Sequence, residues 1–238
     1  MASPATSQSK TAVGAVISVV VGILVVAAVG TTLHAHSNLD APAGYAKVNG
    51  TIVAPDGKTY PHAFINDNVF ADAADSKIHG SSGGHAGWPS YGPYINLVLP
   101  AHTYVTMTMH VYDGGEKMNT PYFASVVGTV GGTINIDGKN VSSLPNDGVQ
   151  HTFTLHGLPT SSQDPLFVNV PLPKTPEGQQ DEPGSPLPKG YTVTFSFITG
   201  GKGNYVWNCE YPCGDSTYQN FGAVMGAPGY MNGKVTVI

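Results

Sequence analysis

The sequence predicts an all-β domain, a sandwich or barrel of short strands, preceded by one membrane-spanning helix. Three observations lead to this prediction. The first is an uncharged apolar stretch at residues 11–33. The second is a series of short segments of alternating apolar and polar residues, separated by turns that use many of the chain's 30 glycines and 19 prolines. The third is that no long segment after residue 33 has the 3.6-residue period of an amphipathic helix.

The first element is the N-terminal apolar segment. Residues 11–33 are mostly Val, Ala, Ile, Leu and Gly, and about twenty such residues span the hydrocarbon core of a bilayer as a helix. They follow a short tail, residues 1–10, with a single lysine. We therefore predict a single-pass anchor in the cell membrane, with the C-terminal domain outside the cytoplasm. The alternative is a cleaved signal peptide, for which Val26–Ala28 offers small residues, although the apolar part of a signal peptide is usually only about 7–15 residues long.

The rest of the chain is predicted to form a linker, residues 34–45, and one domain, residues 46–238. The 238 residues suffice for a sizeable core. Only 11% of the residues are charged, which is too few for a disordered acidic protein. The 10 lysines and arginines are spread along the chain and the net charge is -5, so nucleic-acid binding is not expected.

Within the domain, the strand signals follow one another between irregular segments. Residues 46–54 alternate loosely and end at a Pro-Asp-Gly turn. Residues 94–111 are the clearest strand pair, because Val and Met alternate with Thr and His over its second half. Further strands are expected at residues 150–156, 166–170, 191–198, 204–209 and 234–238. The Gly-, Ser- and His-rich residues 75–93 are expected to form a loop, and residues 116–148 and 160–188 irregular insertions.

Several of these segments, in this order, resemble the cupredoxin family, small Greek-key β-sandwiches that hold copper at one end. Residues 99–113 resemble a family strand with its Asn-x-Asp-like end, and residues 149–155 the segment with the first histidine ligand. Residues 203–209 resemble the strand that ends in the cysteine ligand, and residues 229–235 the segment with the axial methionine. The resemblance covers residues 45–238 and implies a Greek-key cupredoxin-like β-sandwich.

The resemblance also implies three copper ligands: His151, Cys209 and Met231. A type 1 copper centre uses a thiolate, two imidazoles and a weak axial group. The second histidine of the family lies between the cysteine and the methionine, and the corresponding interval here, residues 210–230, contains no histidine. A further ligand would have to be recruited, and the candidates are Cys213, Asp215, His110 and His85.

The chain is also similar to subunit II of haem–copper oxidases, which combines an N-terminal membrane helix with an external cupredoxin domain. The two-copper centre of that subunit uses two cysteines separated by three residues, as Cys209 and Cys213 are. The chain departs from that pattern at Glu210, which follows the first cysteine by one position instead of two, and by the lack of a following histidine. Oxidase relatives that accept electrons from quinol have lost this copper and kept the fold.

The two cysteines leave two interpretations open. As thiolates, Cys209 and Cys213 can bind copper. As a disulfide, which an exported location permits, they would exclude it; such a bridge needs Cα atoms within about 7 Å of each other. His151 likewise is either a ligand or a histidine hydrogen-bonded at the end of a core face.

We therefore expect a membrane-anchored extracytoplasmic electron carrier, with a mononuclear copper held by Cys209, His151 and Met231 and a redox partner protein. It is not expected to be an enzyme, because the sequence has no hydrolase motif and no phosphate-binding loop, and no small-molecule substrate is evident. The alternative is a copper-free structural or interaction subunit with a Cys209–Cys213 disulfide, associated with a respiratory oxidase. A third hypothesis is a copper-delivery domain that binds Cu(I) without redox activity.

Overall fold

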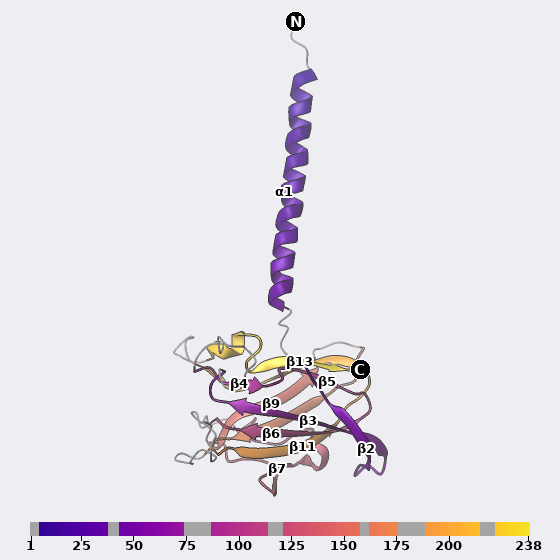
Figure 1. The fold of residues 1–238 in the computed structure, drawn as a ribbon, viewed down its shortest axis with the longest axis vertical. Helices are drawn as coiled ribbons and strands as arrows, with labels where there is room; N and C mark the ends of the chain where they lie inside the picture. Colours follow the sequence, from indigo (N-terminus) through magenta and orange to yellow (C-terminus); the bar gives the residue numbers. More distant parts are fainter. Residues whose placement is uncertain are drawn as a thin grey trace. The chain divides into compact units, whose positions relative to one another are not determined.

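The protein is described here from a computed structural model, which covers residues 5–37, 43–73, 87–113, 121–157, 162–175, 189–214 and 222–238. It contains two compact units, Met1–Asp40 and Ala41–Ile238. The first unit holds one helix and the second holds all the strands (Figure 1).

Helix α1 runs from Ala5 to Ser37 and extends beyond the predicted apolar span at both ends. Its central segment, Val13–Thr31, has a mean hydropathy of 2.8, and every side chain in it is exposed. A helix that is apolar on all sides needs an apolar environment. By length and composition this helix could span a membrane, as could a signal sequence at the same position.

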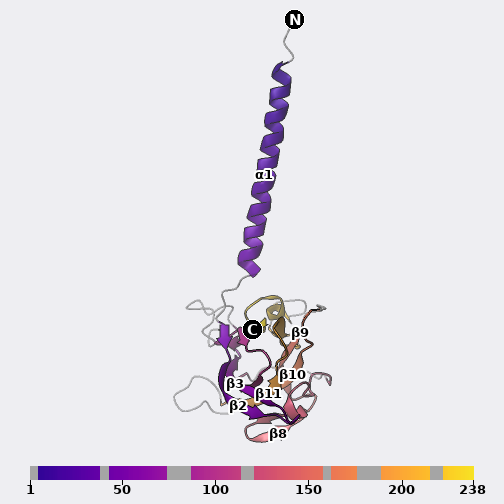
Figure 2. The same ribbon diagram turned by 90° about the vertical axis from the view of Figure 1, so that its right-hand side faces the viewer.

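The second unit is a sandwich of two mixed sheets (Figures 1 and 2). The six-stranded sheet consists, in spatial order, of β1 (Ala43–Tyr45), β5 (Asn96–Leu99), β13 (Asn232–Val237), β12 (Gly203–Asn208), β9 (Val149–Gly157) and β10 (Phe167–Pro173). The seven-stranded sheet consists of β2 (Lys47–Val53), β3 (Thr59–Phe70), β6 (Tyr104–Val111), β11 (Tyr191–Ile198), β7 (Ile134–Ile136) and β8 (Lys139–Val141), with β4 (Ser90–Gly92) paired to β3.

The core lies between the two sheets. Alternate residues of β6 and β11 point inward, as the two-residue period predicts. They meet large side chains from the six-stranded sheet, with Phe153 near both Phe195 and Trp207. Burying apolar side chains on both inner faces contributes the main favourable free energy of such a sandwich.

The chain crosses repeatedly from one sheet to the other. Strand β5 lies in the six-stranded sheet and β6 in the seven-stranded sheet. The chain then returns to the first sheet for β9 and β10, crosses again for β11, and ends in the first sheet with β12 and β13. The predicted all-β sandwich with one N-terminal apolar helix is thus confirmed.

The structure adds strands that the sequence pattern does not reveal. The longest strand, β3, has 12 residues, and its inward positions include the buried carboxylic acid Asp67. Its outward positions include Phe64, which is 41% exposed, so no clean alternation of apolar and polar residues is visible. Strands β4, β7 and β8 have three residues each, too few to show a period.

The predicted linker at residues 34–45 needs correction at both ends. Helix α1 continues to Ser37, and Ala43–Tyr45 form β1, which pairs in parallel with β5. A three-residue strand is held by its partner and leaves no periodic signal in the sequence. His85, Asp215 and most of the expected loop at residues 75–93 lie outside the described residues.

Candidate metal centre

Three predicted site residues meet at one end of the sandwich. One ligand atom each from His151, Cys209 and Cys213 lies within 4.8 Å of the other two. All three residues are buried, with 1%, 0% and 8% of their surfaces exposed. Among the residues that the structure describes, this is the one group of three or more His, Cys, Asp or Glu side chains close enough to hold a metal ion together.

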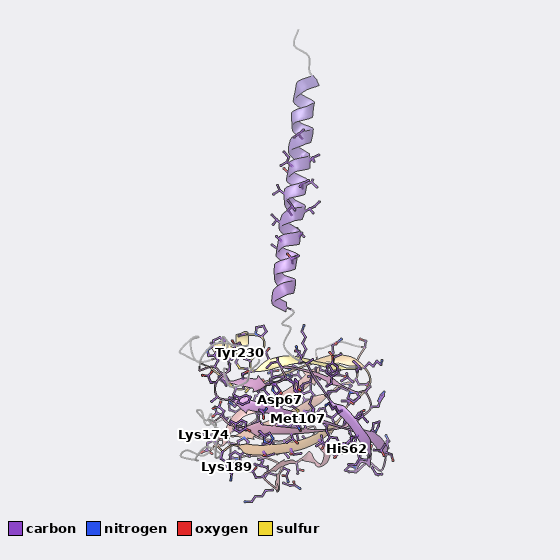
Figure 3. The ribbon with its side chains drawn as sticks, viewed as in Figure 1. His62, Asp67, Met107, Lys174, Lys189 and Tyr230 are labelled. Atoms are coloured by element: carbon purple, nitrogen blue, oxygen red, sulfur yellow. The ribbon has the colours of Figure 1, made fainter. Side chains whose placement is uncertain are left out.

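The strands fix where these side chains lie. His151 sits on β9, which pairs with β12 on one side and with β10 on the other. Cys209 directly follows β12, and its amide donates a hydrogen bond to the Met231 carbonyl at 2.9 Å. Tyr230, the neighbour of Met231, lies at one end of the sandwich and His62 at the opposite end (Figure 3).

A tight turn brings Cys213 back toward Cys209. The Cys213 amide donates to the Tyr211 carbonyl at 2.8 Å. The next residue, Gly214, has φ +77°, and a Cβ there would lie 2.9 Å from Val224. Glycine adopts this left-handed conformation without steric cost, so the turn after Cys213 depends on it.

The three donor atoms form a compact triangle. The Nδ1 atom of His151 lies 3.1 Å from the Cys213 sulfur and 3.8 Å from the Cys209 sulfur. The two sulfurs are 3.4 Å apart, and both cysteines are free. The disulfide interpretation is therefore not the state that the structure shows.

Asp113 sets the orientation of the imidazole. Its Oδ2 lies 2.5 Å from the Nε2 of His151, and Asp113 is 4% exposed. An Nε2–H that donates to a carboxylate leaves Nδ1 to face the sulfurs, the arrangement by which a carboxylate orients a metal-binding histidine. The sequence pattern does not identify Asp113 as a site residue; the available signal was its position at the end of the strand that carries the alternating pattern.

The charges in this cluster depend on one another. Burial opposes protonation of His151, but the charge and the hydrogen bond of Asp113, together with Cys209, raise the pKa of His151 to about 10. Burial also favours a neutral Cys209, but hydrogen bonds from Cys213 and His151, the charge of His151 and the Thr152 amide together lower the pKa of Cys209 well below its usual value. The metal-free cluster therefore holds an imidazolium and a thiolate side by side.

Cys213 carries the proton that Cys209 lacks. Its hydrogen bond to Cys209, its burial and the negative charges of Cys209 and Asp113 raise the pKa of Cys213 well above its usual value. The Cys213 thiol therefore donates to the Cys209 thiolate. A metal ion at this place would displace that proton.

Thr152 connects the cluster to three other parts of the fold. Its amide donates to the Cys209 sulfur at 3.4 Å, and its hydroxyl accepts the Glu210 amide at 2.9 Å. Its carbonyl accepts the hydroxyl of the buried Tyr91, also at 2.9 Å. The Tyr91 ring packs on Trp207, with centroids 4.2 Å apart. Backbone and side chain of Thr152 together hold the Cys209 side of the site.

The structure separates the remaining candidates. Met231 is fully buried, and its carbonyl accepts a hydrogen bond from the amide of Cys209, so the backbone of Met231 lies beside that of Cys209. The axial role of the Met231 sulfur stays a prediction. His110 is half-buried on the outer face of the seven-stranded sheet, with its Nδ1 3.2 Å from the Thr192 hydroxyl. It is not brought into the cluster, because alternate residues of β6 face opposite sides of the sheet.

The donor set fits copper. Thiolate ligands select soft ions such as Cu(I), and imidazole suits copper in either oxidation state. Here two sulfurs and the Nδ1 atom that faces them provide such a set, with the other imidazole nitrogen already bound to Asp113. Cys213 is the one of the four candidates for a further ligand that the structure brings to His151 and Cys209, and its role as a ligand stays a prediction.

Comparisons with known proteins bear on the fold alone. No family model and no curated protein matches the chain. Among solved structures, auracyanin B is 14% identical, with 81% of this chain and 97% of that chain covered and a TM-score of 0.34. Rusticyanin from Thiobacillus ferrooxidans is 12% identical, with 74% and 77% covered and a TM-score of 0.36. Both are cupredoxins, and rusticyanin is a copper protein.

The two-sheet β-sandwich has cupredoxins among its structural neighbours. These identities and TM-scores are too low to carry any statement about a ligand or an activity of this chain. The chain's own residues bring a histidine on β9 and a cysteine directly after β12 into one cluster, and the amide of that cysteine donates to the carbonyl of a methionine directly before β13.

Proposed function

We propose that this protein is a membrane-anchored, extracytoplasmic electron carrier with a mononuclear copper bound by His151, Cys209 and Cys213, and with Met231 as a weak axial ligand. The observation that carries the proposal is the convergence of one imidazole nitrogen and two sulfurs within 4.8 Å of one another in the buried end of the sandwich. Two thiolates and one imidazole are a soft donor set of the kind that copper prefers.

Copper, when bound, supplies one-electron chemistry by cycling between Cu(I) and Cu(II). The protein's part is to hold the donors still. Asp113 orients the imidazole of His151, and the Thr152 amide donates to the Cys209 sulfur. Because these contacts are buried and join β9 to residues just beyond the ends of β6 and β12, the donor positions would change little with oxidation state, which would favour fast electron transfer.

The closed character of the cluster supports a carrier more than an enzyme. His151, Cys209 and Met231 are each at most 1% exposed. An active site needs room for a substrate beside the reacting group, whereas an electron can pass through packed protein. The carrier would therefore act on another redox protein and not on a small molecule.

The proposed location follows from the first unit of the chain. An apolar helix near the N-terminus precedes the sandwich, and a retained helix would anchor it to the membrane. An extracytoplasmic position would also leave Cys209 and Cys213 in the compartment where proteins acquire copper or a disulfide. A protease-protection assay on intact cells tests the side of the membrane.

The direct test is copper loading of the full chain purified in detergent under reducing conditions. We expect one copper per chain and, after oxidation, an intense thiolate-to-copper absorption band. Cys209→Ser should abolish the band. Met231→Leu should keep the copper and shift the band and the reduction potential, because a weak axial ligand tunes the site without holding it. Loss of copper on buffer exchange, with no band, would contradict the proposal.

A second candidate is a copper-free structural or interaction subunit with a Cys209–Cys213 disulfide. One observation favours it: the two sulfurs lie 3.4 Å apart, so a small movement would bring them to bonding distance. A thiol count on the protein purified without reductant distinguishes the two. No free thiol and no retained copper would support the subunit, and two free thiols with bound copper would support the carrier.

A further inference from the structure

A chain of buried polar side chains runs away from the candidate metal centre along the outer face of β9 and β10. The residues involved, Thr152, Thr154 and Asn169, are 0%, 0% and 1% exposed, although they lie on the face opposite the core. A segment at residues 121–129, here called the cover segment, lies beside β10 and binds the Asn169 side chain. It is joined to β10 by reciprocal hydrogen bonds between Val127 and Asn169 at 3.0 and 2.9 Å.

Every link of the chain is a short hydrogen bond. The Asn169 amide group binds two carbonyls of the cover segment, that of Ser125 at 2.7 Å and that of Phe123 at 3.2 Å. The other end of the same side chain is 2.8 Å from the Thr154 hydroxyl. The hydroxyls of Thr154 and Thr152 are 2.9 Å apart. The last link is the 2.9 Å bond from the Glu210 amide to the Thr152 hydroxyl.

The two carbonyls of the cover segment determine which group donates and which accepts in every hydrogen bond of the series. A carbonyl can only accept, so the NH₂ group of Asn169 must face Phe123 and Ser125, and its oxygen must face Thr154. Thr154 then has to donate to Asn169, and it accepts from Thr152. Thr152 in turn accepts from the Glu210 amide. Each hydroxyl thus has one donor role and one acceptor role, and the chain has a single arrangement of its protons.

The series of hydrogen bonds ends at Glu210, the residue that follows Cys209. Glu210 begins the turn that leads to Cys213, and among the described residues the Thr152 hydroxyl accepts the hydrogen bond of the Glu210 amide. The amide of Thr152, on the same residue, donates to the Cys209 sulfur. A shift of the Thr152 side chain would therefore move the start of the turn next to Cys209.

We propose that Thr154 and Asn169 are positioning residues for the metal centre, which transmit the position of the cover segment to the Cys209–Cys213 turn. Their hydrogen bonds reach none of the proposed ligands, and they act through Thr152 and Glu210. The cover segment thereby becomes part of the site, since it holds the far end of the chain. The effect on a bound copper rests on the function proposed above, but the effect on the turn does not.

The test compares three variants of the full chain in detergent. Thr154→Val removes the hydroxyl with little change of shape and interrupts the series of hydrogen bonds in its middle. Thr154→Ser keeps the hydroxyl and serves as the conservative rescue. Thr108→Val is the matched control, because Thr108 is a strand threonine whose hydroxyl pairs with that of Thr194 at 3.3 Å on the other sheet.

Two measurements follow each variant. In the metal-free protein, amide hydrogen exchange of Glu210 reports on the turn directly. We expect exchange in T154V to be about tenfold faster than in the unchanged chain, with T154S and T108V unchanged, because a buried hydrogen-bond partner is lost. In the copper-loaded protein we expect a shifted thiolate-to-copper band and a shifted reduction potential in T154V alone.

The outcomes separate this inference from the proposed function. An unchanged Glu210 exchange rate in a folded T154V protein would overturn the inference, whether or not copper binds. No copper band in the unchanged chain, with accelerated Glu210 exchange in T154V, would overturn the carrier function and keep the positioning role. If T154V does not fold, Thr152→Val is the second variant, since it removes the acceptor of the Glu210 amide and keeps both backbone contacts of Thr152. An unchanged Glu210 rate in that variant would overturn the inference equally.

Discussion

Each sheet carries a layer of threonine, asparagine and histidine side chains, and the two layers differ in how they are covered. On the seven-stranded sheet, the pairs Thr108–Thr194 and His110–Thr192 lie on an outer face that is half-buried, with separations of 3.3 and 3.2 Å. On the six-stranded sheet, β9 carries Thr152 on its outer face and His151 on its inner face, and these residues are 0% and 1% exposed. The residue types are the same, and their surroundings are not.

Burial, more than composition, turns a polar layer into a site. A half-exposed hydroxyl exchanges one partner for water at little cost, whereas a buried one must keep its partner. The same holds for the two histidines. His110 faces a threonine at the surface, while His151 is fixed between a carboxylate and two sulfurs. Substitutions in the two layers should therefore differ in effect.

The largest effect is expected at Asp113. Asp113→Asn keeps the size of the side chain and removes the charge opposite the buried His151. Breaking one partner of a buried pair costs about 3–5 kcal/mol of folding free energy, and losing the residue that orients a metal-binding histidine lowers metal affinity about 10–100-fold. Denaturant unfolding of the metal-free protein and competition with a copper chelator measure the two quantities.

The control for Asp113 lies in the other layer. His110→Gln removes a histidine that is half-buried and bound to a threonine. Its unfolding free energy should change by about 0.5 kcal/mol or less, and copper binding should be unaffected. Equal losses in the two variants would show that burial does not distinguish the layers.

Next in size is the pH dependence of metal binding. Because the pKa of His151 is about 10 and that of Cys213 is raised, both groups carry a proton near pH 7, while Cys209 is already a thiolate. A Cu(I) ion that takes all three donors must therefore displace about two protons. Affinity should rise with pH, by about a hundredfold per pH unit near neutrality, which corresponds to about 2.7 kcal/mol.

Titration with Cu(I) in weak buffer, followed with a pH indicator, measures the number of protons released per copper ion. Cys213→Ser should lower it to about one proton per ion, since only His151 would then give up a proton. A release that is the same in both proteins would mean that Cys213 is not a ligand. His110→Gln should release as many protons as the unchanged chain.

A smaller effect is expected at the buried end of the polar chain. Asn169→Ala removes three hydrogen bonds and leaves the Thr154 hydroxyl and two carbonyls without that partner. We expect a loss of about 2–3 kcal/mol of folding free energy, because each buried group left unsatisfied costs about 1–3 kcal/mol and water can enter the space of the missing side chain. Urea denaturation gives the value, and a loss below about 1 kcal/mol would mean that the cover segment does not seal this face.

The sequence reveals the inner face of the sandwich better than its polar layers. Strand β11 is predicted at its observed bounds, because Val193, Phe195 and Phe197 alternate with polar residues. The ligand order from His151 to Cys209 also follows from sequence, through the resemblance to cupredoxins. Asp113 and the links from Thr154 to Asn169 could not be found, because they depend on contacts between residues far apart in the chain. A burial pattern created by a cover segment has no local period to detect.

The smallest effect is expected on the outer face of the seven-stranded sheet. Thr108→Val replaces a half-buried hydroxyl whose partner on Thr194 is 3.3 Å away, near the upper limit for such a bond. Water can take over the partner, and valine is as favourable as threonine in a strand, so the unfolding free energy should stay within about 0.5 kcal/mol. The double variant Thr108→Val with Thr194→Val should be no less stable than either single one, since no group is then left unpaired. Losses above about 1.5 kcal/mol in the single variant would mean that this face is covered in the folded protein, for instance by a partner, and the contrast between the two layers would disappear.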